Sequence, residues 1–160
     1  MSSSATPFTS SVMEVQKDWI DYNGHMNMAY YNVLFDHCAD EAYEALGLGP
    51  RYAETRRMTT YTAEFHICYL RELHLGDKVR STFQLLDHDE KRFHTFQELW
   101  HEDGWLAATG ESLTLHIDMA GPRVAPFPPD IHEAVAAMMH DHAALPRPER
   151  AGRAIGIKRK

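Results

Sequence analysis

The sequence predicts an α+β domain in which an antiparallel sheet of about five strands wraps around one long helix. Two patterns lead to this prediction. Residues 28–46 contain no Gly or Pro and place apolar side chains at spacings of three, four and seven, which is typical of an amphipathic helix. Residues 61–117 contain four runs in which apolar and polar side chains alternate, which is typical of strands. The 160 residues fit a single domain.

The N-terminal part of the chain is expected to supply a leader, a strand and the start of the helix. Residues 1–7 are Ser-rich and predict a flexible leader. Spaced apolar residues from Phe8 to Trp19 favour a strand. The next stretch, residues 21–27, is rich in turn formers and ends in Asn27, a residue type that caps helices well. Gly47 is expected to end the helix.

Strands fill the middle of the chain, after a polar connector at residues 51–57. The first alternating run covers residues 61–69. Three further runs follow at hairpin spacing and predict an antiparallel meander. They cover residues 79–85, 93–100 and 106–117.

The prolines from Pro122 to Pro129 are expected to end the sheet, and residues 131–144 favour a short amphipathic helix. We therefore predict a domain over residues 8–145 and a basic tail over residues 146–160. One sheet around one helix leaves strand edges and an outer face uncovered. For this reason we expect a homodimer or a dimer of dimers, that is, a homotetramer.

Composition narrows the classes of partner. A hydrophobic fraction of 44% is enough for a core, and 16 basic against 23 acidic residues give a formal charge of -7, which disfavours nucleic acid and anionic membranes as partners. The longest apolar runs are far shorter than the ~20 residues that span a bilayer, and residues 1–7 do not resemble a secretory signal. Cys38 and Cys68 form neither a disulfide framework nor a zinc motif. We expect a cytoplasmic protein.

The stretch from Asp21 to Asn27 is the most informative for chemistry. It places a carboxylate and a tight Gly24 turn directly before the N-terminus of the longest helix, where backbone N–H groups are unpaired and the helix dipole is positive. Such donors can stabilise a developing oxyanion while the carboxylate attacks a carbonyl or activates water, which suits acyl transfer. The alternative is that Asp21, Asn23 and Asn27 only build the turn and the cap.

The string Asp21-Tyr22-Asn23-Gly24-His25-Met26-Asn27, followed by the helix and then by Tyr69 and Gly76-Asp77 before a strand, resembles the hot-dog-fold acyl-CoA thioesterases. The branch most similar to it is typified by 4-hydroxybenzoyl-CoA thioesterase, and the resemblance spans roughly Phe8 to Asp118.

This resemblance implies an acyl-CoA substrate and no cofactor. It implies that Asp21 is the nucleophile or general base and that the backbone N–H of Met28 polarises the thioester carbonyl. His25 and Asn27 stand where the type member is apolar, although related thioesterases carry Gly-His-Met-Asn here. Whether His25 or Asn27 touches substrate stays open, and both are kept as catalytic candidates.

A narrower resemblance links residues 61–72 and the tail Gly152–Ile157 to the betainyl-CoA thioesterases of carnitine catabolism. It implies an acyl group with a trimethylammonium, for which aromatic rings and an acid are suitable partners. The candidate substrate-binding residues are Gly24, Trp19, Tyr30, Glu64 and Arg71, with Tyr22 and Trp100 as further rings. The alternative is that Glu64 is solvated and the aromatics are core residues.

Coenzyme A carries phosphates, which a chain of charge -7 must bind through locally gathered cations. Each candidate cation could equally be a solvated surface residue. The candidates are Arg56, Arg57, Arg71, Lys91, Arg92, Arg147, Arg150, Arg153, Lys158, Arg159 and Lys160.

Other chemistries have weaker support. The 11 histidines form no metal-binding motif, so no metal is expected, and His140 and His142 are expected to point to water from a surface helix. Cys38 and Cys68 are expected to pack rather than to attack, and no Gly-x-Ser-x-Gly elbow exists. The alternatives to a thioesterase are a non-hydrolytic hot-dog acyl-CoA-binding protein, a hot-dog dehydratase and a purely structural dimer.

Overall fold

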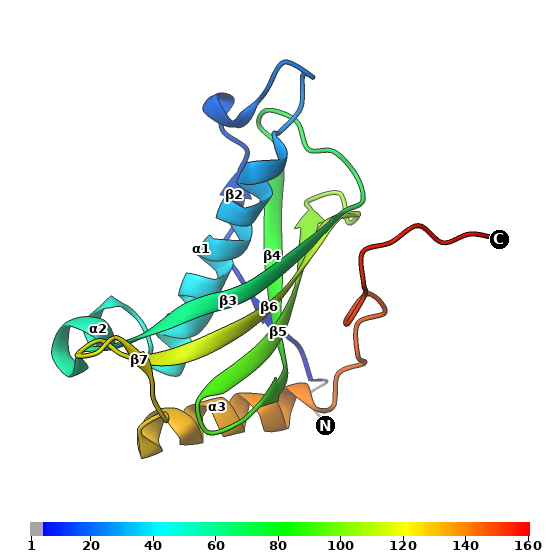
Figure 1. Cartoon of the computed structure of the whole chain (residues 1–160). Helices are drawn as coiled ribbons and strands as arrows, with labels where there is room; N and C mark the ends of the chain where they lie inside the picture. The colour runs from blue at the N-terminus through cyan, green and yellow to red at the C-terminus, as the bar shows by residue number, and fades with distance from the viewer. Residues whose placement is uncertain (1–4) are drawn as a thin grey trace.

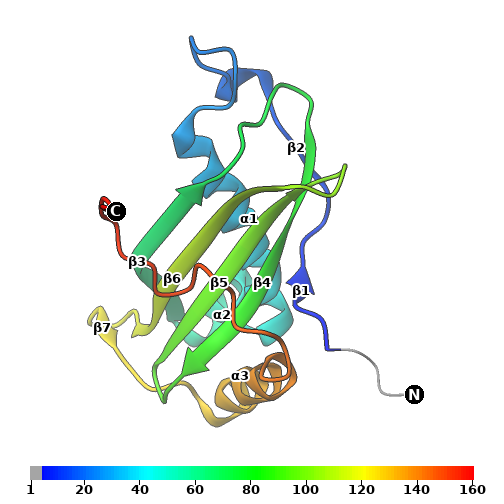
Figure 2. The same cartoon turned by 90° about the vertical axis from the view of Figure 1, so that its right-hand side faces the viewer.

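A single antiparallel sheet of seven strands forms the body of the protein in a computed structural model that describes residues 5–160. Residues 1–4 of the predicted leader lie outside the described residues. The strand order is β1-β4-β5-β6-β3, while β2 pairs with β4 and β7 pairs with β6 (Figures 1 and 2). The strands are β1 (Phe8–Thr9), β2 (Met13–Glu14), β3 (Met58–Tyr69), β4 (Lys78–His88), β5 (Arg92–His101), β6 (Leu106–Asp118) and β7 (Arg123–Val124).

The long helix α1 (Met28–Leu46) has the predicted boundaries. The Oδ1 atom of Asn27 accepts a hydrogen bond from Ala29 N at 3.0 Å, which caps the first turn. Gly47 ends the helix with φ at 82°, a left-handed conformation that glycine adopts without strain. The sheet curves around α1, and α3 (Pro129–His142) lies across the opposite end of the strands from the start of α1 (Figure 1).

The helix approaches the sheet closely at Gly110 in β6. A Cβ atom at this position would lie 2.8 Å from the ring of Phe65 and 3.3 Å from the ring of Phe35, which is fully buried. The absent side chain therefore lets α1 and β3 pack their rings together over β6. Cys38 also lies in this layer, where its thiol donates to Ser81 O at 3.3 Å, so its predicted packing role is confirmed.

Two segments on either side of α1 have a different secondary structure from the one predicted. The single strand expected over residues 8–19 is two short strands followed by the 3-10 helix η1 (Lys17–Trp19), because the Ser11 N–H leaves the ladder to donate to Glu41 of α1 at 2.8 Å. The polar connector expected over residues 51–57 is the helix α2 (Pro50–Arg56). Pro50 was expected only to stop α1. It also begins α2, because proline is favourable in the first turn of a helix.

The expectation that His142 points to water is also wrong. Its side chain is buried, and its Nδ1 atom accepts a hydrogen bond from Leu85 N at 2.9 Å. This contact ties the last turn of α3 to β4 just before the irregularity between Leu85 and Asp87, where a ladder hydrogen bond is lost. His142 therefore supplies the acceptor that a buried backbone N–H requires.

Candidate active site

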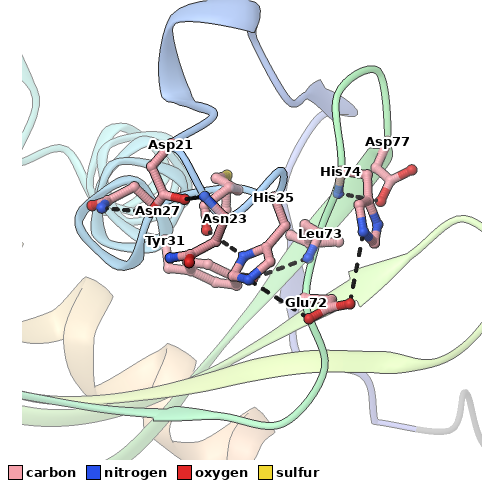
Figure 3. Close-up of polar contacts among 10 residues, drawn as sticks. Asp21, Asn23, His25, Asn27, Tyr31, Glu72, Leu73, His74 and Asp77 are labelled. Atoms are coloured by element: carbon pink, nitrogen blue, oxygen red, sulfur yellow. Dashed lines mark hydrogen bonds and ion pairs between the residues drawn. The ribbon is translucent and has the colours of Figure 1, made fainter.

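The turn before α1 is closed by hydrogen bonds on both sides of the Asp21 carboxylate. Asn23 N donates to Oδ1 of Asp21 at 2.8 Å, and Nδ2 of Asn27 donates to Oδ2 at 2.9 Å (Figure 3). Gly24, with φ at 82°, allows the chain to reverse, and its N–H donates to Asp21 O at 3.0 Å. The acid, the turn and the helix cap therefore form one unit, as the sequence predicts.

These donors keep Asp21 ionised. The backbone N–H of Asn23 lowers the pKa of the carboxyl most, the side-chain amide of Asn27 lowers it further, and the nearby His25 adds a smaller decrease. A deprotonated carboxylate is the form that acts as a base or a nucleophile. Beside it, within residues 5–160, no hydrogen bond uses the N–H of Met28, the first residue of α1.

The loop between β3 and β4 holds the turn from the other side. Met26 N donates to Leu73 O at 2.7 Å, and Leu73 N donates to the hydroxyl of Tyr31 at 3.1 Å (Figure 3). The hydroxyl of Tyr69, at the end of β3, donates to Met28 O at 3.0 Å. The end of β3 and the loop that follows it, 41 and 42 residues away from their partners in α1, therefore fix the start of this helix.

His25 points away from the Asp21 carboxylate and towards this loop (Figure 3). Its Nε2 atom lies 3.7 Å from the carboxylate of Glu72, and Nε2 of His74 lies 3.7 Å from the other oxygen of the same carboxylate. The sequence analysis does not name Glu72 or Tyr31 as residues of the candidate site. Their positions follow from the β3–β4 loop folding onto the turn, which no local spacing signals.

Two of the predicted substrate-binding aromatics come together. The rings of Trp19 and Tyr30 stack with their centroids 5.5 Å apart and an angle of 12° between their planes. Because Trp19 O accepts from Asn27 N at 2.9 Å, this stack lies beside the turn. Tyr22 is 97% exposed in the turn, whereas Trp100 lies on β5 beside Arg80 in a separate pocket.

Glu64 and Arg71 are not brought to the carboxylate. Glu64 is exposed and lies five residues before Tyr69, about 16 Å along an extended strand. Arg71 lies in the β3–β4 loop, and its guanidinium is 4.0 Å from the ring centroid of Trp105. Of the other candidate cations, Arg56 is paired with Asp130 and Arg92 with Asp89.

A cavity of about 390 Å³ opens beside the first turn of α1. It begins at Ala29 and follows α1 to Tyr43, with Phe65 and Ser112 of the sheet on its other side. A ligand whose reacting carbon lies at the Met28 N–H therefore has space along the helix. Among residues 5–160, no group of three or more His, Cys, Asp and Glu side chains could hold a metal ion, and no helix is both long and apolar enough to cross a bilayer.

A family model described as the thioesterase-like superfamily matches residues 15–135, well over half of the chain. The chain belongs to the thioesterase-like superfamily. This superfamily member is similar to betainyl-CoA thioesterase of Pseudomonas aeruginosa, with 36% identity over 144 residues, which cover 89% of this chain and 91% of the relative. It is also similar to L-carnitine dehydrogenase/betainyl-CoA thioesterase of Rhizobium meliloti, with 36% identity over 148 residues. That match covers 91% of this chain and 29% of the longer relative.

Solved structures agree with this membership. A Staphylococcus aureus protein determined in complex with CoA superposes with a TM-score of 0.90 at 32% identity, and the match covers 99% of both chains. A Thermus thermophilus thioesterase complexed with coenzyme A and Zn has a TM-score of 0.71 at 21% identity, over 84% of this chain and 96% of that one, and shows the fold alone. The predicted hot-dog fold and the prediction of a thioester hydrolase are confirmed.

Proposed function

We propose that this chain hydrolyses an acyl-CoA thioester at the N-terminus of α1. The observation that carries the proposal is the ionised Asp21 carboxylate, held at 2.8 and 2.9 Å by Asn23 and Asn27 next to the unused N–H of Met28. A thioester carbonyl that accepts this N–H would have its carbon exposed to attack, and the positive end of the helix dipole would stabilise the oxyanion.

Two routes from this geometry lead to the same products. As a general base, Asp21 removes a proton from water, the resulting hydroxide attacks the carbonyl carbon, the C–S bond breaks, and CoA leaves as a thiol after taking up the proton. As a nucleophile, the Asp21 carboxylate forms a mixed anhydride as the thiolate leaves, and water then hydrolyses that anhydride. In both routes Asn27 and Asn23 orient the carboxylate, and His25 stays a candidate for contact with substrate.

For the acyl group we propose the betainyl group, in which one methylene separates a trimethylammonium from the carbonyl. The nitrogen then lies about 2.5 Å from the carbonyl carbon, so its partners must lie beside Asp21 and Met28. The stacked pair of Trp19 and Tyr30 meets this requirement better than Glu64, which lies far along β3. The names of the two betainyl-CoA thioesterase relatives support the same acyl group.

Release of free thiol from a panel of acyl-CoAs tests the proposed reaction. We expect hydrolysis of betainyl-CoA and slower hydrolysis of other short acyl-CoAs. Binding of the panel without thiol release would instead support an acyl-CoA-binding protein, and loss of water from a hydroxyacyl-CoA would support a dehydratase. A chain that binds no CoA would support a purely structural dimer.

The charge of the acyl group needs its own comparison. We expect kcat/KM for betainyl-CoA to exceed that for the neutral isostere 3,3-dimethylbutyryl-CoA at least tenfold, which is ~1.4 kcal/mol and within reach of one desolvated cation–π contact. Trp19→Leu should reduce this ratio while leaving hydrolysis of the neutral compound nearly unchanged. Equal values for the two substrates in the wild type would reject the cation pocket but not the thioesterase.

A further inference from the structure

The C-terminal tail crosses the outer face of the sheet, which is the face turned away from α1 (Figure 2). Near its start, Nε2 of Gln84 in β4 donates to Pro146 O at 3.2 Å. Farther along, Gly152 N donates to both carboxylate oxygens of Glu111 in β6, at 2.8 and 3.0 Å. The tail is thus attached to its own domain at two points, from β4 across to β6.

The outer face also carries a buried apolar side chain, Phe96. Phe96 of β5 alternates with Thr95 and Gln97, which point to the inner face, so Phe96 points to the outer face. It is nevertheless only 3% exposed, and the tail is the segment that crosses this face. Glu111, which holds Gly152, is itself fixed by His94, whose Nε2 atom lies 2.6 Å from Oε2.

Beyond Gly152 these attachments end. We call residues 153–160 the C-terminal arm. Every residue of the arm is exposed, and its two large apolar side chains, Ile155 and Ile157, are 88% and 83% exposed. The arm points away from the sheet in Figure 1. An extended segment with two isoleucines in water is a surface that gains stability by binding apolar groups.

The charge of the arm differs from that of the rest of the chain. It holds four basic residues and no acid, so the formal charge of -7 for the whole chain becomes -11 for the chain without the arm. The basic residues are Arg153, Lys158, Arg159 and Lys160. A second copy of this chain therefore offers a body of complementary charge.

The sheet also has an open edge at which a second copy can attach. The strand order ends at β3, whose other edge has no partner strand in the described part of the chain. β3 is 12 residues long, with residues 61–64 exposed, and such an edge favours pairing with another strand.

We propose that the C-terminal arm docks on a second copy of this chain, with Ile155 and Ile157 buried against that copy and the four cations facing its acidic surface. The docked part, residues 146–152, fixes the start of the arm, and the arm extends from there to the second copy. Because this interaction needs no substrate, it stands or falls independently of the proposed thioesterase reaction.

The stability of the assembly tests the proposal. We expect Ile155→Ser combined with Ile157→Ser to raise the dissociation constant of the oligomer at least tenfold, or to halve its mass, in sedimentation velocity over a dilution series. A chain truncated after Gly152 should behave in the same way. These residues contact little of their own domain, so the melting temperature of the separated protomer should not change. The matched control is Val12→Ser, which removes an apolar side chain that is 50% exposed at another place. An unchanged mass and dissociation constant in both arm variants would overturn the proposal.

Crosslinking identifies the occupant directly. A benzophenone side chain placed at position 157 of one tagged copy, mixed with an untagged copy and illuminated, should give an adduct of twice 18.3 kDa that contains both copies. Adducts only within one chain would mean that the arm folds back on its own domain. Adducts that form only with added anionic lipid vesicles would mean that the arm binds a membrane. Either outcome rejects docking on a second copy.

Discussion

At the residue scale, Asp21 is held by its neighbours in the ionised form that the proposed reaction requires. Its carboxylate accepts one backbone and one side-chain hydrogen bond, which together lower its pKa, while Asn27 also caps α1. Orientation and ionisation therefore come from the same two contacts. A substitution that keeps the size of the side chain and the contact with Asn23 N but removes the charge separates chemistry from most of the structure.

Asp21→Asn is that substitution. The amide has the size of the carboxylate and its oxygen can accept from Asn23 N, so the circular dichroism spectrum should match that of the wild type. Its NH2 group cannot accept from Nδ2 of Asn27, so the melting temperature should fall slightly. It supplies neither a base nor a good nucleophile, so kcat for thioester hydrolysis should fall by at least ~10²-fold. The control is Asp18→Asn, an exposed acid in η1, which should leave kcat unchanged. Near wild-type kcat in Asp21→Asn would remove Asp21 from the mechanism.

His142 makes folding depend on pH. Burial lowers the pKa of its imidazole below the ordinary value of 6.5, against a smaller opposite effect of Asp141. The unfolded chain therefore binds this proton more readily than the folded chain. Full stability is present above pH 6.5 and is lost as the pH falls from there through the lower pKa of the folded state.

We expect the wild-type melting temperature to decrease between pH 7.5 and 5.5 more steeply than that of His142→Gln, which keeps an acceptor for Leu85 N but does not titrate. His140→Gln, at an exposed position of the same helix, should retain the wild-type slope. Parallel slopes for the wild type and His142→Gln would contradict the assignment.

At the scale of elements, the position of α1 depends on how closely it approaches β6. The ring of Phe35 and the ring of Phe65 occupy the space above Gly110, and the first turn of the same helix carries Met28. Any change that lifts α1 from the sheet therefore also moves the candidate site.

Gly110→Ala should lower the free energy of unfolding by about 1–3 kcal/mol, because the new Cβ atom would meet Phe65 at 2.8 Å in a packed layer. Denaturant titration measures this loss. Gly121→Ala is the control, since this position is exposed and its Cβ atom would meet only Arg123, at 3.3 Å or more, so stability should stay unchanged. Equal stability of both variants would mean that the ring of Phe65 moves aside at little cost.

At the scale of the whole molecule, the sheet closes against α1 on one face and ends at β3, whose outer edge has no partner strand among residues 5–160. We predict that the active species is a homodimer or a dimer of dimers. Light scattering at assay concentrations should give two or four times 18.3 kDa. An active monomer of 18.3 kDa would contradict this prediction.

Two further expectations stay predictions. They are the cytoplasmic location of the protein and the binding of CoA phosphates by Arg71 or by the basic tail.

The sequence by itself determined the parts of this protein that depend on nearby residues. The spacing of apolar residues and the flanking Asn27 and Gly47 specify α1 to the residue, because capping and amphipathic packing act within one or two turns. The hairpin spacing specifies the meander β4-β5-β6 in the same way. The turn from Asp21 to Asn27 needs only its own side chains.

Only the tertiary structure decided which distant segments pair and hydrogen-bond with one another. β3 pairs with β6 rather than with its neighbour in sequence, β4, whose second edge is occupied by β1 and β2. Tyr31 and Leu73 meet across 42 residues, and His142 reaches β4 because a lost ladder bond leaves Leu85 N without a strand partner. Such contacts are set by where buried polar groups find partners in three dimensions, and the local pattern of the chain holds no signal for them.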